Sequence, residues 1–174
     1  MKTRAFIAID IPESIKDKIS APEIENARKV DGKQLHITLI FLGYVDENEI
    51  EKTKRIISSI RQKPFLVSLK GMGLFASGSH GVVFAGIEKG EKEISAIYSE
   101  IGGRLGNLES KEFIPHVTVL RLKNIKSKKE IIEKLDKMKN DAFGSFLCDE
   151  IKLKKSTLGR NGVVYEDLFV KELR

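Results

Sequence analysis

One short pattern, a histidine followed two positions later by a threonine inside an apolar run, occurs twice in this chain. The first copy is His36-Ile37-Thr38-Leu39, and the second, eighty residues later, is His116-Val117-Thr118-Val119. Runs of apolar and β-branched residues are typical of buried strands. Side chains alternate between the faces of a strand, so each histidine shares a face with its threonine, about 6.5 Å away. An imidazole and a hydroxyl at this spacing both reach one phosphoryl-sized group.

A histidine on a strand is most often a structural residue, and this alternative applies to each histidine taken alone. The chain has three histidines and five threonines, yet two of the three histidines carry a threonine two positions on. The matched apolar flanks make chance a poor explanation. The pattern therefore predicts two related functional strands.

Further parallels extend the repeat over most of the chain. Each tetrad is followed, ten or eleven residues after its histidine, by a helix-start signal of the capping-box type. A strand then begins at Phe65 in one half and at Phe146 in the other. The halves, near residues 34–87 and 114–170, each predict the order strand, helix, strand, strand. Packed about a pseudo-two-fold axis, they bring both histidines to one cleft.

The predicted fold class is α+β, with two pseudo-symmetric lobes around a central cleft. Each lobe is expected to be an antiparallel sheet with helices on its outer face, and residues 1–174 form a single domain. Residues 4–11 are predicted as a buried strand, and a short helix opens at Pro12. Residues 21–34 are polar and irregular, and an apolar stripe from Ile94 to Leu105 predicts a helix.

Composition limits the classes of protein that fit. At 174 residues with 41% hydrophobic content, the chain is long enough for one globular domain. It has no apolar run of the roughly 18 residues that span a bilayer, and no signal-peptide pattern at its start. The lone Cys148 cannot form an internal disulfide, which favours a reducing cytoplasm. The net charge of +6 suits a polyanionic substrate.

The residue types in the tetrads favour acid–base chemistry on a phosphodiester. Imidazole has an ordinary pKa near 6.5, so one ring is able to donate a proton while the other accepts one near neutral pH. Threonine hydroxyls are suited to hydrogen-bond the non-bridging phosphate oxygens. A metal site would need about three converging protein ligands, and neither tetrad has a neighbouring carboxylate. No nucleophile motif is present, so water is the expected attacking group.

A different kind of enzyme is suggested by Lys29-Val30-Asp31-Gly32. This stretch matches the Lys-x-Asp-Gly pattern of ATP-dependent nucleic-acid ligases, in which the lysine is adenylated. The pattern is short and has no companion motif here, and only about 140 residues follow it. An Asp-Gly pair before a strand is already explained as a turn.

Taken together, these residues resemble the two-histidine phosphoesterases, in the branch of RNA 2′,3′-cyclic phosphodiesterases and 2′-5′ RNA ligases. The mark of that family is one His-x-Thr/Ser-x tetrad in each half of the chain. The resemblance also covers residues 4–10, Phe41-Leu42-Gly43 after the first tetrad, and residues 156–166 near the C-terminus. The segment at 21–34 is shorter than its family counterpart.

The resemblance implies hydrolysis of a 2′,3′-cyclic phosphate at an RNA 3′ end to a 2′-phosphate, without metal or ATP. His36 is then the proton donor and His116 the acceptor, with Thr38 and Thr118 binding the phosphate. A 5′-hydroxyl in place of water would give a 2′-5′ linkage. The implied partner is RNA with a cyclic phosphate end, such as a tRNA fragment, and the implied state is a cytoplasmic monomer. The alternative is a non-catalytic RNA-binding module on the same fold.

Four other residues are candidates with open alternatives. Phe75 resembles the family aromatic that stacks a nucleobase, but a core position explains it equally well. Arg121 occupies a position where the family often has arginine, and a bulge or a strand end would be needed to bring it to the face of His116. Tyr165 is either a cleft or a core residue, and His80 is expected at the surface. The lysines at 123–129 and at 152, 154 and 155 are either solvated or in contact with RNA.

Overall fold

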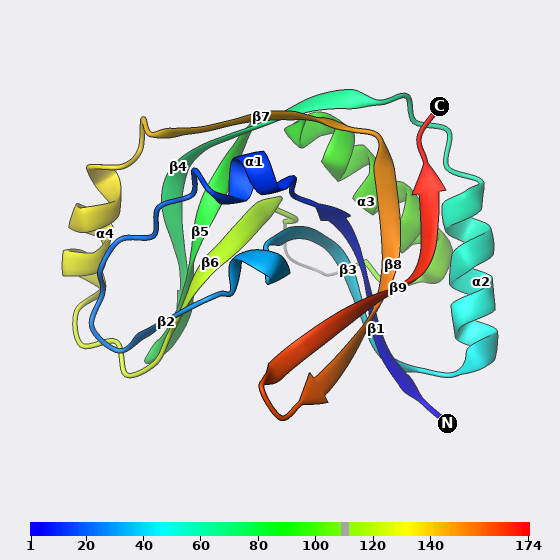
Figure 1. Ribbon diagram of the computed structural model, residues 1–174, viewed down its shortest axis with the longest axis horizontal. Helices are drawn as coiled ribbons and strands as arrows, with labels where there is room; N and C mark the ends of the chain where they lie inside the picture. The colour runs from blue at the N-terminus through cyan, green and yellow to red at the C-terminus, as the bar shows by residue number, and fades with distance from the viewer. Residues whose placement is uncertain (109–111) are drawn as a thin grey trace.

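The computed structural model describes residues 1–108 and 112–174 and consists of one curled sheet with helices around it (Figure 1). The strands, in chain order, are β1 (Thr3–Asp10), β2 (Ala27–Lys29), β3 (His36–Val45), β4 (Phe65–Ser77), β5 (His80–Lys89), β6 (His116–Leu122), β7 (Ala142–Cys148), β8 (Glu150–Gly159) and β9 (Gly162–Glu172). The helices are α1 (Glu13–Lys16), the 3-10 helix η1 (Gly32–Gln34), α2 (Glu47–Ser58), α3 (Glu91–Leu105) and α4 (Lys128–Asp136).

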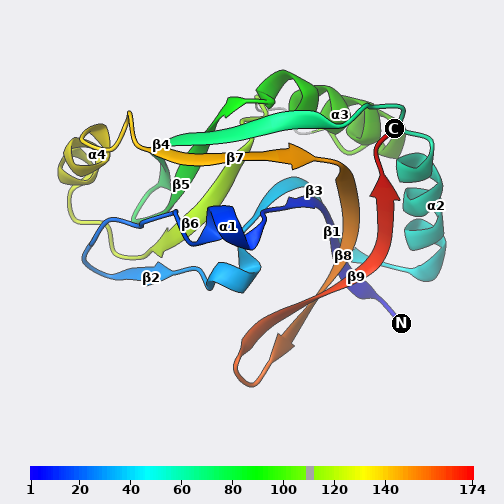
Figure 2. The same ribbon diagram turned by 45° about the horizontal axis from the view of Figure 1, so that its top comes forward.

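The sheet must curl strongly because of how β7 and β8 are connected. The strand order is β7-β4-β5-β6-β3-β1-β8-β9, with β2 paired to β6, and the ladders are antiparallel. Only Asp149 separates β7 from β8, although five strands lie between them in the sheet. One residue spans only about 3.8 Å. The two parts of the sheet are therefore brought close, and Figure 2 shows β7 bending into β8.

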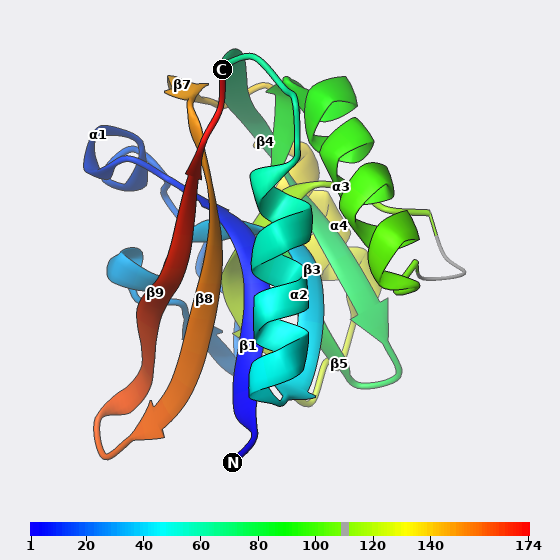
Figure 3. The same ribbon diagram turned by 90° about the vertical axis from the view of Figure 1, so that its right-hand side faces the viewer.

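Amphipathic helices cover the outer side of the sheet. Asp46 and Glu49 form the predicted capping box at the start of α2, each bonding the backbone N–H of the other. The apolar stripe of α3, at Ile94, Ile97 and Ile101, is buried against the sheet. Figure 3 shows α2 and α3 side by side on the side opposite α1 and η1. None of the described helices is long and apolar enough to cross a membrane.

The structure confirms the predicted α+β class. Two local expectations were wrong. The strand expected to begin at Phe146 begins at Ala142, because the edge of β4 provides pairing partners also for Ala142, Gly144 and Ser145. The segment at 21–34 contains the unpredicted strand β2, whose three residues have no apolar pattern and are held by pairing to β6. The division into two pseudo-symmetric lobes stays a prediction.

Candidate active site

The strands that carry the two tetrads, β3 and β6, are neighbours in the sheet. The register pairs Ile37 of β3 with Val117 of β6, and both side chains are completely buried. Beyond this pair β3 leaves β6, and β2 takes its place beside residues 120–122 of β6. The tetrads therefore meet at the point where the two strands part.

This pairing crosses the tetrads. In antiparallel strands, the residues on either side of a pair also face each other, so His36 lies opposite Thr118 and Thr38 lies opposite His116. Side chains alternate along a strand, so all four residues lie on the face opposite the buried pair, which we call the histidine face. Diagonal neighbours in such a ladder have α-carbons about 7–8 Å apart, which is the relation between the two histidines. The structure thus brings all four predicted tetrad side chains together.

The same backbone contact orients both imidazole rings. Nδ1 of His36 lies 2.6 Å from the carbonyl oxygen of Gln34, and Nδ1 of His116 lies 2.8 Å from that of Ile114. A carbonyl oxygen only accepts hydrogen bonds, so each Nδ1 carries a proton and donates it. Each ring therefore keeps Nε2 as the nitrogen that exchanges protons with a substrate.

Two aromatic rings flank His36. The ring centre of Phe6 lies 5.1 Å and that of Tyr165 lies 5.4 Å from the centre of the imidazole. The side chain of Gln34 donates a hydrogen bond of 2.6 Å to the carbonyl oxygen of Val163, and so links η1 to β9 next to this site. Tyr165 does not belong to the apolar core of the described residues. Of the two positions that the sequence left open, cleft or core, the structure therefore places it beside His36 on the histidine face.

Two further rings flank His116. The ring centres of Phe75 and Phe84 lie 5.0 and 5.3 Å from the imidazole, and the two rings stack with centres 4.2 Å apart. Gly73 makes room for this stack, because a β-carbon there would lie 2.3 Å from Cζ of Phe84. Phe75 is half-buried beside His116 and outside the described core cluster, so the core alternative for it is wrong. Stacking of a nucleobase on it stays a prediction.

The aromatic partners are exchanged between the two sequence repeats. Phe84, from the first repeat, contacts His116 of the second, whereas Tyr165, from the second repeat, contacts His36 of the first. Each histidine therefore depends on both repeats for its surroundings.

A bulge brings Arg121 to the histidine face. Thr118 pairs with Phe84, and Leu120 pairs with the very next residue of β5, Val83, so β6 carries one extra residue between them. An extra residue reverses the alternation of side chains beyond it. Arg121 is exposed, and it lies on the same side as Thr118. The bulge that Arg121 needs to reach the face of His116 is therefore present.

A matching bulge follows the first tetrad and brings forward Phe41, which is part of the family resemblance but was not predicted as a site residue. Thr38 pairs with Ala8, and Ile40 pairs with Ile7, so β3 also has an extra residue after its threonine. Phe41 follows this bulge at the position that corresponds to Arg121, and it is 63% exposed. The signal that could have found it is its spacing, because Phe41 follows His36 by five residues, as Arg121 follows His116.

A ring of four charges beside His36 was not predicted. Lys152 contacts Asp10 and Asp167 at 2.9 and 3.0 Å, and Lys154 contacts the same two carboxylates at 3.0 and 2.6 Å. Asp10 is paired with His36 across β1 and β3, which places the ring next to the site. Lys152 and Lys154 are therefore members of an ion-pair network, in place of the solvated or RNA-contacting role expected from sequence.

The surroundings set the direction of the histidine pKa shifts. Burial lowers the pKa of both imidazoles, while the hydrogen bonds to Gln34 and Ile114 oppose it. For His36, the positive charges of Lys154 and Arg121 also lower the pKa, while the negative charge of Asp10 opposes them. Both rings are therefore more often neutral in the free protein than an exposed histidine would be.

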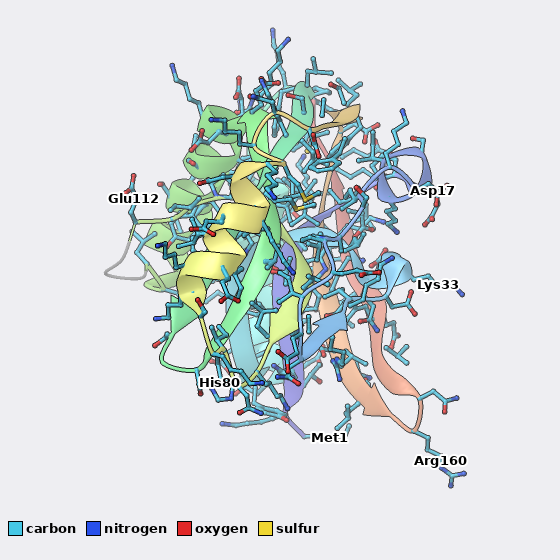
Figure 4. All side chains as sticks on the ribbon, turned by 90° about the vertical axis from the view of Figure 1, so that its left-hand side faces the viewer. Met1, Asp17, Lys33, His80, Glu112 and Arg160 are labelled. Atoms are coloured by element: carbon cyan, nitrogen blue, oxygen red, sulfur yellow. The ribbon has the colours of Figure 1, made fainter. Side chains whose placement is uncertain are left out.

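Other candidates from the sequence lie apart from this group. His80 is exposed at the hairpin between β4 and β5, as expected (Figure 4). Asp31 caps η1 by accepting a hydrogen bond from the backbone N–H of Lys33, so the Asp-Gly pair forms a turn. Burial raises the pKa of the Cys148 thiol to about 12, so it is not a thiolate near neutral pH. Within residues 1–108 and 112–174, no cluster of three or more potential metal ligands is found.

A curled antiparallel sheet that joins two His-x-Thr tetrads defines the class of two-histidine phosphoesterases. A sequence model described as the 2′-5′ RNA ligase superfamily matches residues 11–160, and the chain belongs to this family. Two relatives, from Methanocaldococcus jannaschii and Archaeoglobus fulgidus, are named RNA 2′,3′-cyclic phosphodiesterase. They are 36% and 32% identical, covering 94% and 97% of this chain and 96% and 99% of their own lengths.

Solved structures share the fold. LigT from E. coli in its apo form has a TM-score of 0.79 at 24% identity, covering 99% of this chain and 98% of its own. A structure described as a phosphoesterase has a TM-score of 0.83 at 22% identity, covering 99% of both chains. These similarities show the same arrangement of strands and helices.

Proposed function

We propose that this protein hydrolyses the 2′,3′-cyclic phosphate at the 3′ end of RNA to a 2′-phosphate, using His36 and His116 as acid and base. The observation that carries the proposal is the crossed pair of tetrads, which places two Nε2 atoms and two hydroxyls on one face. The names of the archaeal relatives support the same substrate.

In the proposed mechanism, Nε2 of His116 takes a proton from water as its oxygen attacks phosphorus. The bond from phosphorus to O3′ breaks, and Nε2–H of protonated His36 gives its proton to O3′. The attacking and departing oxygens lie on opposite sides of phosphorus, which suits two groups on different strands. An anionic substrate between the rings raises the pKa of both and so favours the protonated form that His36 needs. Thr38 and Thr118 are proposed to hold the oxygens of the reacting phosphate, with Arg121 as a further residue that binds the RNA substrate.

With a 5′-hydroxyl in place of water, the same displacement joins two RNA ends through a 2′-5′ linkage. The energy of the cyclic phosphate bond is retained in the new diester, so ATP is not needed. We propose this ligation as a second outcome at the same site. A tRNA fragment as the RNA, a monomeric state and a cytoplasmic location stay predictions.

The product identifies the activity. An RNA oligonucleotide with a 2′,3′-cyclic phosphate end should be converted to a 2′-phosphate, resolved from the 3′-phosphate by chromatography against both standards. Binding of this RNA without conversion would favour the alternative of a non-catalytic RNA-binding module. Formation of the 3′-phosphate would contradict the proposed direction of bond cleavage.

Activity should be independent of metal ions and ATP. We expect equal rates with EDTA and with added divalent ions, since the proposed steps use only imidazoles, hydroxyls and water. Lys29→Ala should leave the rate unchanged. Lys29 on β2 pairs with Leu120 on β6, and both side chains lie on the face of the sheet away from the tetrads. Loss of activity in EDTA, or an AMP adduct at Lys29, would overturn this prediction.

The two threonines should act in the transition state. Thr38→Ala and Thr118→Ala each remove a hydroxyl that is proposed to bond a phosphate oxygen, and a hydrogen bond to a charged group corresponds to roughly a tenfold to hundredfold effect. We expect this loss in kcat, with KM changed less. Thr38→Ser and Thr118→Ser are the matched controls and should retain most of the activity. A rise in KM alone would mean that the hydroxyls bind only the ground state.

A further inference from the structure

Two arginines face each other across β2 and β6. Arg28, in the middle of β2, is the direct pairing partner of Arg121 on β6, and both are exposed. Directly opposite side chains in an antiparallel ladder have β-carbons about 4.5–5.5 Å apart, and like charges in such positions are destabilising. The arrangement therefore has a cost that a bound anion would remove.

Neither guanidinium has a carboxylate partner in the described part of the chain. No salt bridge within 4.0 Å among the described residues includes Arg28 or Arg121. Glu25 lies three residues before Arg28 in the sequence, but its carboxylate pairs with Lys126 at 2.9 Å instead. The pair of arginines is thus left with its positive charge uncompensated.

The pair lies on the histidine face. The bulge in β6 turns Arg121 to the side of Thr118, and Arg28 shares that side because it is the direct partner. The neighbouring Lys29 alternates to the other side and lines a hollow with Leu120. Arg121 follows Thr118 by three residues, one of which is the extra residue of the bulge, so it lies two regular steps or about 7 Å further along the strand. A chain of phosphates that leaves the tetrads along β6 therefore reaches both arginines.

We propose that Arg28 and Arg121 together bind an internucleotide phosphate of the RNA strand that ends in the cyclic phosphate. This inference rests on the proposed function. Two guanidinium groups offer paired N–H donors that match the oxygens of a phosphodiester. The protein then prefers a cyclic phosphate at the end of an oligonucleotide to the same group on a mononucleotide, which lacks the internucleotide phosphate.

The test compares a 2′,3′-cyclic mononucleotide with an oligoribonucleotide that has the same terminal nucleotide. Arg28→Ala should lower the ratio of kcat/KM for the oligonucleotide to that for the mononucleotide by about tenfold, the scale of one charged hydrogen bond. It should also reduce the salt dependence of kcat/KM for the oligonucleotide by a logarithmic slope of about 0.7, the value for one contact to single-stranded nucleic acid. Arg28→Lys should keep the slope, because it keeps the charge.

Lys29→Ala is the matched control, since it removes one positive charge from the same strand on the other face. It should change neither the ratio nor the slope. An unchanged ratio and slope in Arg28→Ala, with both substrates still hydrolysed, would overturn this inference and leave the proposed function intact. If the unmodified protein hydrolyses neither substrate, the proposed function and this inference both fail. The hydrolysis reaction contains a single RNA strand. The expected result therefore means that Arg28 and Arg121 bind the strand that ends in the cyclic phosphate.

Discussion

Replacing either His36 or His116 by alanine is expected to lower kcat/KM for the cyclic phosphate by at least about 10²-fold, the usual scale for a lost acid or base. In each ring the Nδ1–H is bound to a backbone carbonyl oxygen. Only Nε2 is therefore available to exchange a proton with the substrate. The measurement is steady-state hydrolysis of the cyclic phosphate by the two variants. His80→Ala is the control, since His80 lies exposed at a hairpin, and it should retain full activity.

The two variants should differ with a substrate whose leaving group needs no proton. Such a substrate should largely restore the activity of the His36→Ala variant, because the missing acid is no longer required. It should leave His116→Ala inactive, because the base that activates water is still absent. Restoration of His116→Ala would reverse the assignment of roles. Restoration of neither would mean that the histidines do not divide the work in this way.

The second large effect is on stability. Lys154→Met should lower the free energy of unfolding by about 3 kcal/mol, the low end for a broken buried ion pair. The side chain of Lys154 is only 9% exposed and contacts two carboxylates, and its loss leaves Asp10 and Asp167 with Lys152 alone. The low end applies because both carboxylates are partly exposed. Urea unfolding at neutral pH measures the change.

Lys155→Met is the matched control for this change. Lys155 is the next residue in β8, but it is more exposed and its contact with Glu166 is long, at 3.8 Å. Surface pairs of this kind contribute about 1 kcal/mol or less. A similar loss of stability in both variants would mean that the ion-pair ring has no special role.

The contribution of the ring should depend on pH in a defined direction. Burial alone would raise the pKa of Asp10 and Asp167, but hydrogen bonds from Lys152 and Lys154 outweigh burial and lower it. A carboxylate with a lowered pKa adds stability above its unfolded pKa of about 3.9 and loses it as pH falls through the lower folded value. The difference between the unmodified protein and Lys154→Met should therefore be full at neutral pH and shrink below about pH 4. A constant difference would contradict this.

The tetrads and the elements around them could be predicted because their signals are local. A histidine and threonine two positions apart define one face of a strand, and the capping box of α2 lies within four residues. Neither signal required knowledge of which strand lies beside which.

The remaining features depend on pairing between distant strands. Asp10 and Asp167 join Lys152 and Lys154 only because β1 and β9 both lie beside β8. The crossing of the tetrads follows from the pair Ile37 and Val117, and no local pattern specifies that register. Strand β2 shows the same limit, since its three residues have no apolar alternation and form a strand only by pairing with β6.

The pH dependence of kcat/KM for the cyclic phosphate tests the two-histidine account most directly. The unmodified protein should give a bell-shaped profile whose two apparent pKa values belong to the coupled pair. The acidic limb reflects the unprotonated base and should disappear in His116→Ala. The alkaline limb reflects the protonated acid and should disappear in His36→Ala. If either variant keeps both limbs of the bell, His36 and His116 are not the acid and base of this reaction.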